Sequence, residues 1–152
     1  MKEYSDHRMH TAEHLLNQTM VRMFGQGRAF SSHIEKKKSK CDYRFSRNLT
    51  GEETAEIEKR VNEAIRADLP VREDFVPREA AAEKLDLRRL PEGTGDKLRV
   101  VLIGDYDACP CIGPHVNSTG EIGGFRIVST SFENGVLRVR FKLVETDKRE
   151  RH

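Results

Sequence analysis

Two pairs of residues with metal-ligating side chains stand near opposite ends of this 152-residue chain. His10 and His14 are four positions apart, so a helix places both imidazoles on one face, about 6 Å apart at Cβ. Cys111 and His115 repeat that spacing in a segment rich in turn-forming residues. Three imidazoles and one thiolate suit tetrahedral zinc, so the sequence predicts a zinc site with four protein ligands. These are His10, His14, Cys111 and His115.

The spacing leaves alternatives open at this predicted site. Cys109 competes with Cys111 for the thiolate position, since both lie in the same short segment. Four protein ligands are typical of a structural zinc, whereas a catalytic zinc keeps one position open for water or substrate. Without a metal, Cys111 would be a buried thiol and His115 a hydrogen-bonded core residue.

The first pair also satisfies a peptidase pattern. Residues 10–14 read H-x-x-E-H, the motif of inverzincin metallopeptidases, with Glu13 as general base. That hypothesis needs a distant Glu as third ligand and leaves Cys111 and His115 unused. The chain is also short for a peptidase.

Hydrophobic periodicity places the first pair on a helix and the second pair in a loop. Apolar residues at helical spacing predict helices over residues 11–24 and 53–68, and a Pro at its first turn favours a short helix over 78–85. Residues 90–96 are predicted as loop. Strands are predicted over residues 30–34, 40–45, 71–76, 98–103, 124–131 and 135–144, the first two and the last two as hairpins.

The composition bounds the class of protein. Hydrophobic residues make up 36% and charged residues 34%, which excludes a membrane-spanning segment. The net charge of +2 means that any nucleic-acid binding must come from local clusters of basic residues. Three cysteines and no apolar stretch at the start favour the reducing cytoplasm. We expect an α+β fold, a two-layer sandwich of a mainly antiparallel sheet with helices packed on it, in one domain over residues 1–146 with a disordered tail over 147–152.

Three segments together resemble a known family. Residues 10–16, 111–116 and 118–127 are similar to the second additional domain shared by alanyl- and threonyl-tRNA synthetases, and the resemblance runs over residues 7–144. At this length the chain resembles the AlaX-type proteins, free-standing relatives of the alanyl-tRNA synthetase editing domain. Residues 112–114 read Ile-Gly-Pro where alanyl-type members carry Gly-Gly-Thr, which leaves the amino acid substrate open.

The resemblance implies an aminoacyl-tRNA deacylase. Such proteins hydrolyse, in trans, the ester of a mischarged tRNA, most typically seryl-tRNA for alanine, and their zinc ligands match the four residues above. The implied partner is the acceptor end of tRNA. The general base or nucleophile is not identified by the sequence.

Further residues could bind parts of this substrate. Ser31 and Ser32, on the strand that looks like the pocket wall of the family, could hydrogen-bond a serine hydroxyl, although they could equally be ordinary strand serines. A basic cluster at the adjacent hairpin tip could neutralise tRNA phosphates or simply be a solvated tip. The cluster consists of Lys36, Lys37, Lys38 and Lys40. A second function stays open: a non-catalytic domain, stabilised by zinc, that binds tRNA or a protein partner.

Overall fold

The computed structural model describes residues 7–35, 37–77, 97–111 and 113–145. Over these residues the chain forms two α-helices, one short 3-10 helix and seven β-strands. The helical elements are α1 (His7–Phe24), α2 (Gly51–Arg66) and η1 (Thr119–Ile122). The strands are β1 (Ser31–His33), β2 (Ser39–Arg44), β3 (Val71–Pro77), β4 (Lys97–Ile103), β5 (Asp107–Pro110), β6 (Gly124–Glu133) and β7 (Val136–Val144).

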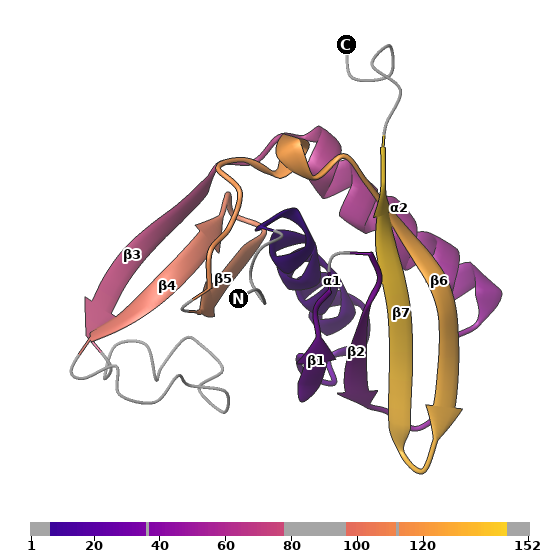
Figure 1. Cartoon of the computed structure of the whole chain (residues 1–152). Coiled ribbons are helices and arrows are strands. Elements are labelled where there is room, and N and C mark those ends of the chain that lie inside the picture. The colour runs from indigo at the N-terminus through magenta and orange to yellow at the C-terminus, as the bar shows by residue number, and fades with distance from the viewer. Residues whose placement is uncertain (1–6, 36, 78–96, 112, 146–152) are drawn as a thin grey trace.

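The strands form two sheets with α1 between them. One sheet has the order β1-β2-β7-β6 and the other β3-β4-β5, and every strand pair is antiparallel. Figure 1 shows α1 flanked by the two sheets, and α2 packs along β6. The predicted α+β class is confirmed. The division of the strands between two sheets was not predicted, because hydrophobic alternation identifies strands but not their partners.

Helix α1 is buried around most of its circumference. Every residue from Met9 to Asn17 is buried, so the helix lies inside the protein instead of on one face of a sheet. Five of these nine residues are polar and need polar partners when they are buried. They are His10, Thr11, Glu13, His14 and Asn17. The helix begins at His7, four residues earlier than predicted, and ends at Phe24. Gly25 follows it with a φ of 69°, which is typical of a glycine that stops a helix.

Helix α2 and the β6–β7 hairpin complete the core. Thr50 and Glu53 form a capping box at the start of α2, which therefore begins two residues before the predicted helix. The apolar face of α2 packs against β6, and Ile57 and Val61 are fully buried. The β6–β7 turn has positive φ at Asn134 and Gly135, as predicted from the Asn-Gly pair.

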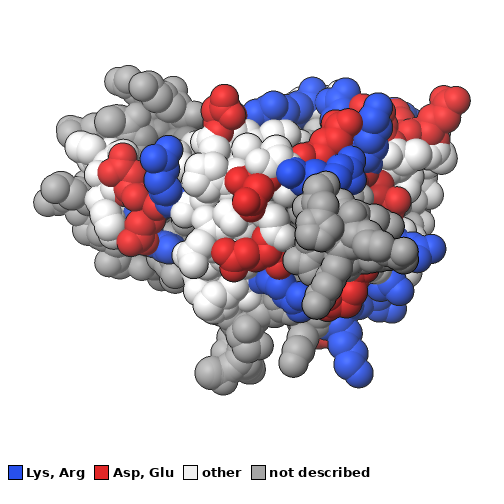
Figure 2. Space-filling view, turned by 90° about the horizontal axis from the view of Figure 1, so that it is seen from above, with Lys and Arg blue, Asp and Glu red and all other residues white. Residues whose placement is uncertain are grey.

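Some predictions lie outside the described residues, and two elements were missed. The predicted helix over 78–85, the loop over 90–96 and the tail over 147–152 are not among the described residues. Strand β5 and helix η1 were not predicted, since both have only four residues and no periodic pattern. Within the described residues, no helix is long and apolar enough to cross a membrane. Figure 2 shows Lys and Arg side chains interspersed with Asp and Glu on the face seen from above.

Candidate metal centre

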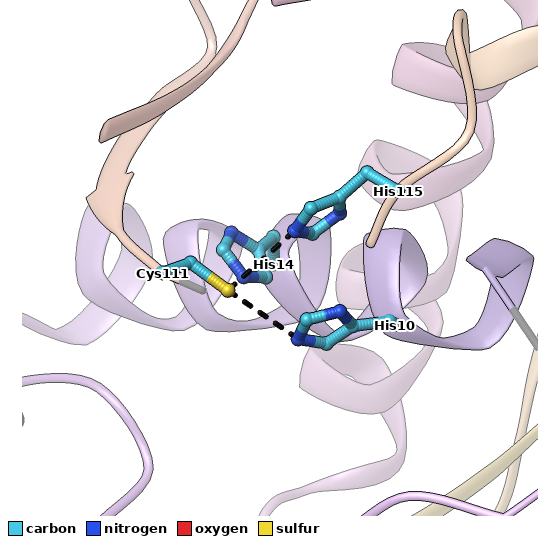
Figure 3. A group of neighbouring side chains, drawn as sticks. All are labelled: His10, His14, Cys111 and His115. Atoms are coloured by element: carbon cyan, nitrogen blue, oxygen red, sulfur yellow. Dashed lines mark hydrogen bonds between the residues drawn. The ribbon is translucent and has the colours of Figure 1, made fainter. Parts of the chain in front are cut away.

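The four predicted ligands come together between α1 and the loop that follows β5. Their ligand atoms all lie within 4.8 Å of one another. Cys111 Sγ is 3.6 Å from Nε2 of His10 and 3.6 Å from Nε2 of His115. In Figure 3 the four side chains converge on a common centre, two from the helix and two from the loop. Residues about 100 positions apart in the chain thus form one cluster.

The imidazoles of His10 and His115 are oriented by hydrogen bonds on the far side of each ring. His10 Nδ1 donates to the Pro114 carbonyl at 3.0 Å. His115 Nδ1 lies 2.9 Å from the hydroxyl of Thr11, which donates its own proton to His7 O and therefore accepts from the imidazole. Both rings then carry their proton on Nδ1 and leave the Nε2 lone pair for a metal.

His14 is oriented by a buried ion pair. Its Nδ1 lies 3.4 Å from Asp107 Oδ2, and Arg28 binds the same carboxylate through two contacts of 2.9 and 3.2 Å. The approach of Nδ1 to Asp107 is an ion-pair contact without hydrogen-bond geometry. Burial lowers the pKa of His14, but Asp107, Cys111 and Glu13 together outweigh burial and raise this pKa to about 9. All three imidazoles therefore direct Nδ1 to an oxygen, the arrangement usual for metal-binding histidines.

The two candidate thiols, Cys109 and Cys111, differ in pKa and in their distance from the cluster. Burial raises the pKa of Cys111, but hydrogen bonds with His10, His115 and His14 outweigh it and lower the pKa to about 3, so the thiolate that binds metals is favoured. Burial raises the pKa of Cys109 to about 12, and its thiol donates to Pro110 O. Cys109 lies outside the cluster, so the geometry selects Cys111 as the candidate ligand.

His115 favours its neutral form. Burial, the largest effect, lowers its pKa to about 4. A neutral imidazole is the form that binds a metal. Three oriented imidazoles and one thiolate fit zinc in donor type and number.

The loop that carries Cys111 and His115 is anchored by Arg99. Its Nη1 donates to the carbonyls of Cys111 and Gly113 at 2.9 and 3.0 Å, and its Nε pairs with Glu73 on β3. Gly113 packs directly against the imidazole of His10, because a Cβ at this position would lie 2.3 Å from the ring. Only glycine permits so close an approach.

Beside the cluster lies a polar group formed by α1 and β1. Ser32 Oγ donates to Glu13 Oε2 at 2.7 Å, and Glu13 Oε1 lies 3.9 Å from His10 Nε2. The structure thus places Ser32 next to the candidate metal centre. Ser31 is exposed, since adjacent strand residues face opposite sides. The predicted role of both serines in substrate binding stays a prediction.

The structure describes three of the four lysines of the predicted basic cluster. Lys37 and Lys38 are exposed between β1 and β2, Lys40 is half-buried on β2, and Lys36 lies outside the described residues. Their contact with tRNA stays a prediction.

Sequence reasoning missed the residues that support the ligands. Thr11, Arg28, Arg99 and Asp107 do not belong to the spacing pattern of the ligands, and only the tertiary structure brings them together. The position of Asp107 in the sequence could have indicated a functional role, because it follows the predicted buried strand over residues 98–103, and polar residues in such connecting segments are often functional.

Comparisons with known proteins relate the chain to tRNA synthetases. The family described as the threonyl and alanyl tRNA synthetase second additional domain matches residues 98–139, which include Cys111 and His115 but neither His10 nor His14. An alanine–tRNA ligase of Aeropyrum pernix is 36% identical over 145 residues, covering 92% of this chain. Those of Treponema denticola and Bacillus subtilis are 36% and 39% identical and cover 86% and 80% of the chain.

The chain corresponds to a small part of each of these ligases. It spans 16% of the Aeropyrum protein, 22% of the Treponema protein and 14% of the Bacillus protein. The chain therefore resembles this additional domain and a segment of alanine–tRNA ligases.

Proposed function

We propose that this chain hydrolyses the ester bond of a mischarged aminoacyl-tRNA, with a zinc ion held by His10, His14, Cys111 and His115. The observation that carries the proposal is the convergence of these side chains, with their imidazoles already oriented, in a chain similar to alanine–tRNA ligases. A bound zinc ion would polarise a carbonyl or lower the pKa of a water molecule.

The residues around the cluster would position the aminoacyl group. Ser32 donates its proton to Glu13, and its oxygen also faces Cys41 Sγ at 3.5 Å, so one acceptor position is left for a hydrogen bond from a substrate hydroxyl. A substrate without that hydroxyl would leave the half-buried Ser32 oxygen with an acceptor position unfilled, which favours serine over alanine. This supports seryl-tRNA for alanine as the substrate. Ser31 is kept as a second candidate for the same contact.

Four lysines would contact the tRNA. The lysines at positions 36, 37, 38 and 40 would neutralise phosphates of the acceptor end, because they follow the strand that carries Ser32. The reaction would occur in trans, on tRNA that another enzyme has charged. As a step of translation it would take place in the cytoplasm.

One observation favours a second candidate function. Four protein ligands fill a tetrahedral zinc site, which is the usual pattern of a structural zinc. In that case the ion would hold α1 and the loop together, and the chain would bind tRNA or a protein partner without hydrolysis. The peptidase hypothesis is not adopted, because it leaves unused the two residues that complete the cluster.

A deacylation panel tests the proposal. The zinc-loaded chain is incubated with tRNA for alanine charged with serine, glycine or alanine, and with threonyl-tRNA, with and without a chelator. We expect rapid release of serine, little release of alanine, and loss of activity with the chelator. Tight tRNA binding with no deacylation of any of these substrates would establish the non-catalytic function instead.

A further inference from the structure

The side chain of Glu13 is a buried acid that the candidate ligand set does not use. It is 8% exposed and lies on the same helix face as His10. Burying a carboxylate is unfavourable unless it has strong partners. Within the described residues, neither a Lys nor an Arg forms an ion pair with it. Glu13 therefore needs an explanation beyond packing.

One oxygen of Glu13 is fixed by neighbouring donors. Oε2 accepts from Ser32 Oγ at 2.7 Å and from Asn17 Nδ2 at 3.3 Å. The amide of Asn17 is itself oriented, because its oxygen accepts from Tyr43 Oη and from the Ala29 backbone N–H. The network holds the carboxylate in one orientation.

The other oxygen is free to bind a ligand. The described contact of Oε1 is with His10 Nε2, at 3.9 Å, which is longer than a hydrogen bond. His10 Nε2 is also the atom that faces Cys111 Sγ. Oε1 therefore lies at the edge of the metal centre, on the side where Ser32 is placed.

We propose that Glu13 Oε1 binds the α-ammonium group of the aminoacyl ester, so that the site selects esters that carry a free amine. The inference rests on the proposed function. A buried carboxylate with one oriented, uncommitted oxygen recognises a cation better than a neutral group. In a serine ester the amine is bonded to Cα and the hydroxyl to the adjacent Cβ, so Glu13 and Ser32, which lie side by side, can contact both groups together. Glu13 would bind the amine, and Ser32 would bind the hydroxyl.

Two other roles of Glu13 make different predictions. If Glu13 activated a water molecule as general base, its removal would slow hydrolysis of every ester equally. If it served only to balance the charge of the metal, its removal would weaken zinc binding without changing which ester is preferred.

The test compares seryl-tRNA with its α-hydroxy analogue, in which a hydroxyl of the same size replaces the ammonium group. Wild type should hydrolyse the amine ester with a kcat/KM roughly 10 to 100 times higher, as expected for a hydrogen bond between charged groups. Glu13→Gln should reduce this ratio to near one, whereas Glu13→Asp should keep part of it. Glu52→Gln, at an exposed position on α2, is the matched control and should leave the ratio unchanged.

Binding provides an independent readout. The non-hydrolysable 3′-amide analogue of seryl-adenosine should bind wild type roughly 10 to 100 times more tightly than its α-hydroxy counterpart. Equal rates and equal binding of amine and hydroxy forms by wild type would overturn the inference without any variant, as would an unchanged ratio in a folded, zinc-loaded Glu13→Gln. If no ester is hydrolysed, the proposed function fails, and the binding comparison still decides the role of Glu13.

Discussion

The Thr11 hydroxyl lies 2.9 Å from His115 Nδ1 and joins the two halves of the metal centre. The two residues are 104 positions apart in the sequence. Thr11 also accepts the backbone N–H of Val116 at 3.2 Å, so a single side chain of α1 fixes both the ring of His115 and the loop that carries it. This threonine lies between the two histidines of the helix and positions a third.

Replacing this threonine should weaken metal binding. Thr11→Val keeps the shape of the side chain but removes the acceptor for His115 Nδ1, and loss of such a contact typically costs about 10- to 100-fold in metal affinity. Thr19→Val is the matched control, because Thr19 is buried on the same helix and has no contact with the cluster. Competition with a chromophoric chelator measures both affinities. Equal affinities in the two variants would contradict the role of Thr11.

The two cysteines near β5 should behave differently. Cys111→Ser removes the thiolate from the cluster, so the purified protein should lose most of its zinc. Cys109→Ser should keep its zinc, because Cys109 lies outside the cluster and its high pKa disfavours the thiolate. Zinc content per chain in each variant, measured by elemental analysis, shows which cysteine is the ligand. Loss of zinc in Cys109→Ser alone would mean that the other thiol is the ligand.

Gly113 should not tolerate a side chain. In Gly113→Ala the new Cβ would lie 2.3 Å from His10 Cε1, so either the ring or the loop must move. We expect a large loss of zinc affinity. Gly51→Ala meets no atom within 4 Å at the start of α2 and should leave zinc affinity unchanged. Titration of both variants with zinc, followed by calorimetry, is the measurement, and wild-type affinity in Gly113→Ala would show that the loop adapts.

The capping box of α2 should make part of the stability depend on pH. Hydrogen bonds from Arg47 and from the Thr50 backbone lower the pKa of Glu53 from 4.5 to about 2. A carboxyl with a lowered pKa in the folded state stabilises the protein above its unfolded pKa, and this contribution disappears as the pH falls from about 4.5 to about 2.

The measurement is the free energy of unfolding of metal-free wild type and Glu53→Gln. Wild type should be more stable at pH 7, and the difference should shrink below pH 4.5. Glu52→Gln, one position earlier, is the control and should not show this loss. A difference between wild type and Glu53→Gln that is constant from pH 7 to pH 2 would contradict the assignment.

The ligands of the candidate metal centre could be predicted from the sequence because their chemistry is tied to spacing. His10 and His14 share a helix face, and the loop between β5 and η1 is short enough to bring Cys111 and His115 to one point. The sequence favours Cys111 over Cys109 because Cys111 alone lies four positions before His115, and the structure agrees, since Cys109 lies outside the cluster.

The supporting residues could not be predicted, because their roles depend on tertiary contacts. Asp107 and Arg28 pair across 79 positions, and Glu13 meets Ser32 across 19. A single sequence contains no signal for such pairs. The sequence places Glu13 on the helix between His10 and His14 but assigns it no contact. Its burial and its hydrogen bond with Ser32 show that it lies beside the cluster.

Zinc K-edge X-ray absorption of the loaded wild-type chain tests the central claim most directly, because it counts the ligands of the ion. We predict three nitrogen ligands at about 2.0 to 2.1 Å and one sulfur ligand at about 2.3 Å. The sulfur should be absent from the spectrum of any zinc retained by Cys111→Ser. A first shell without sulfur, or with two sulfur atoms, would contradict the metal centre described above.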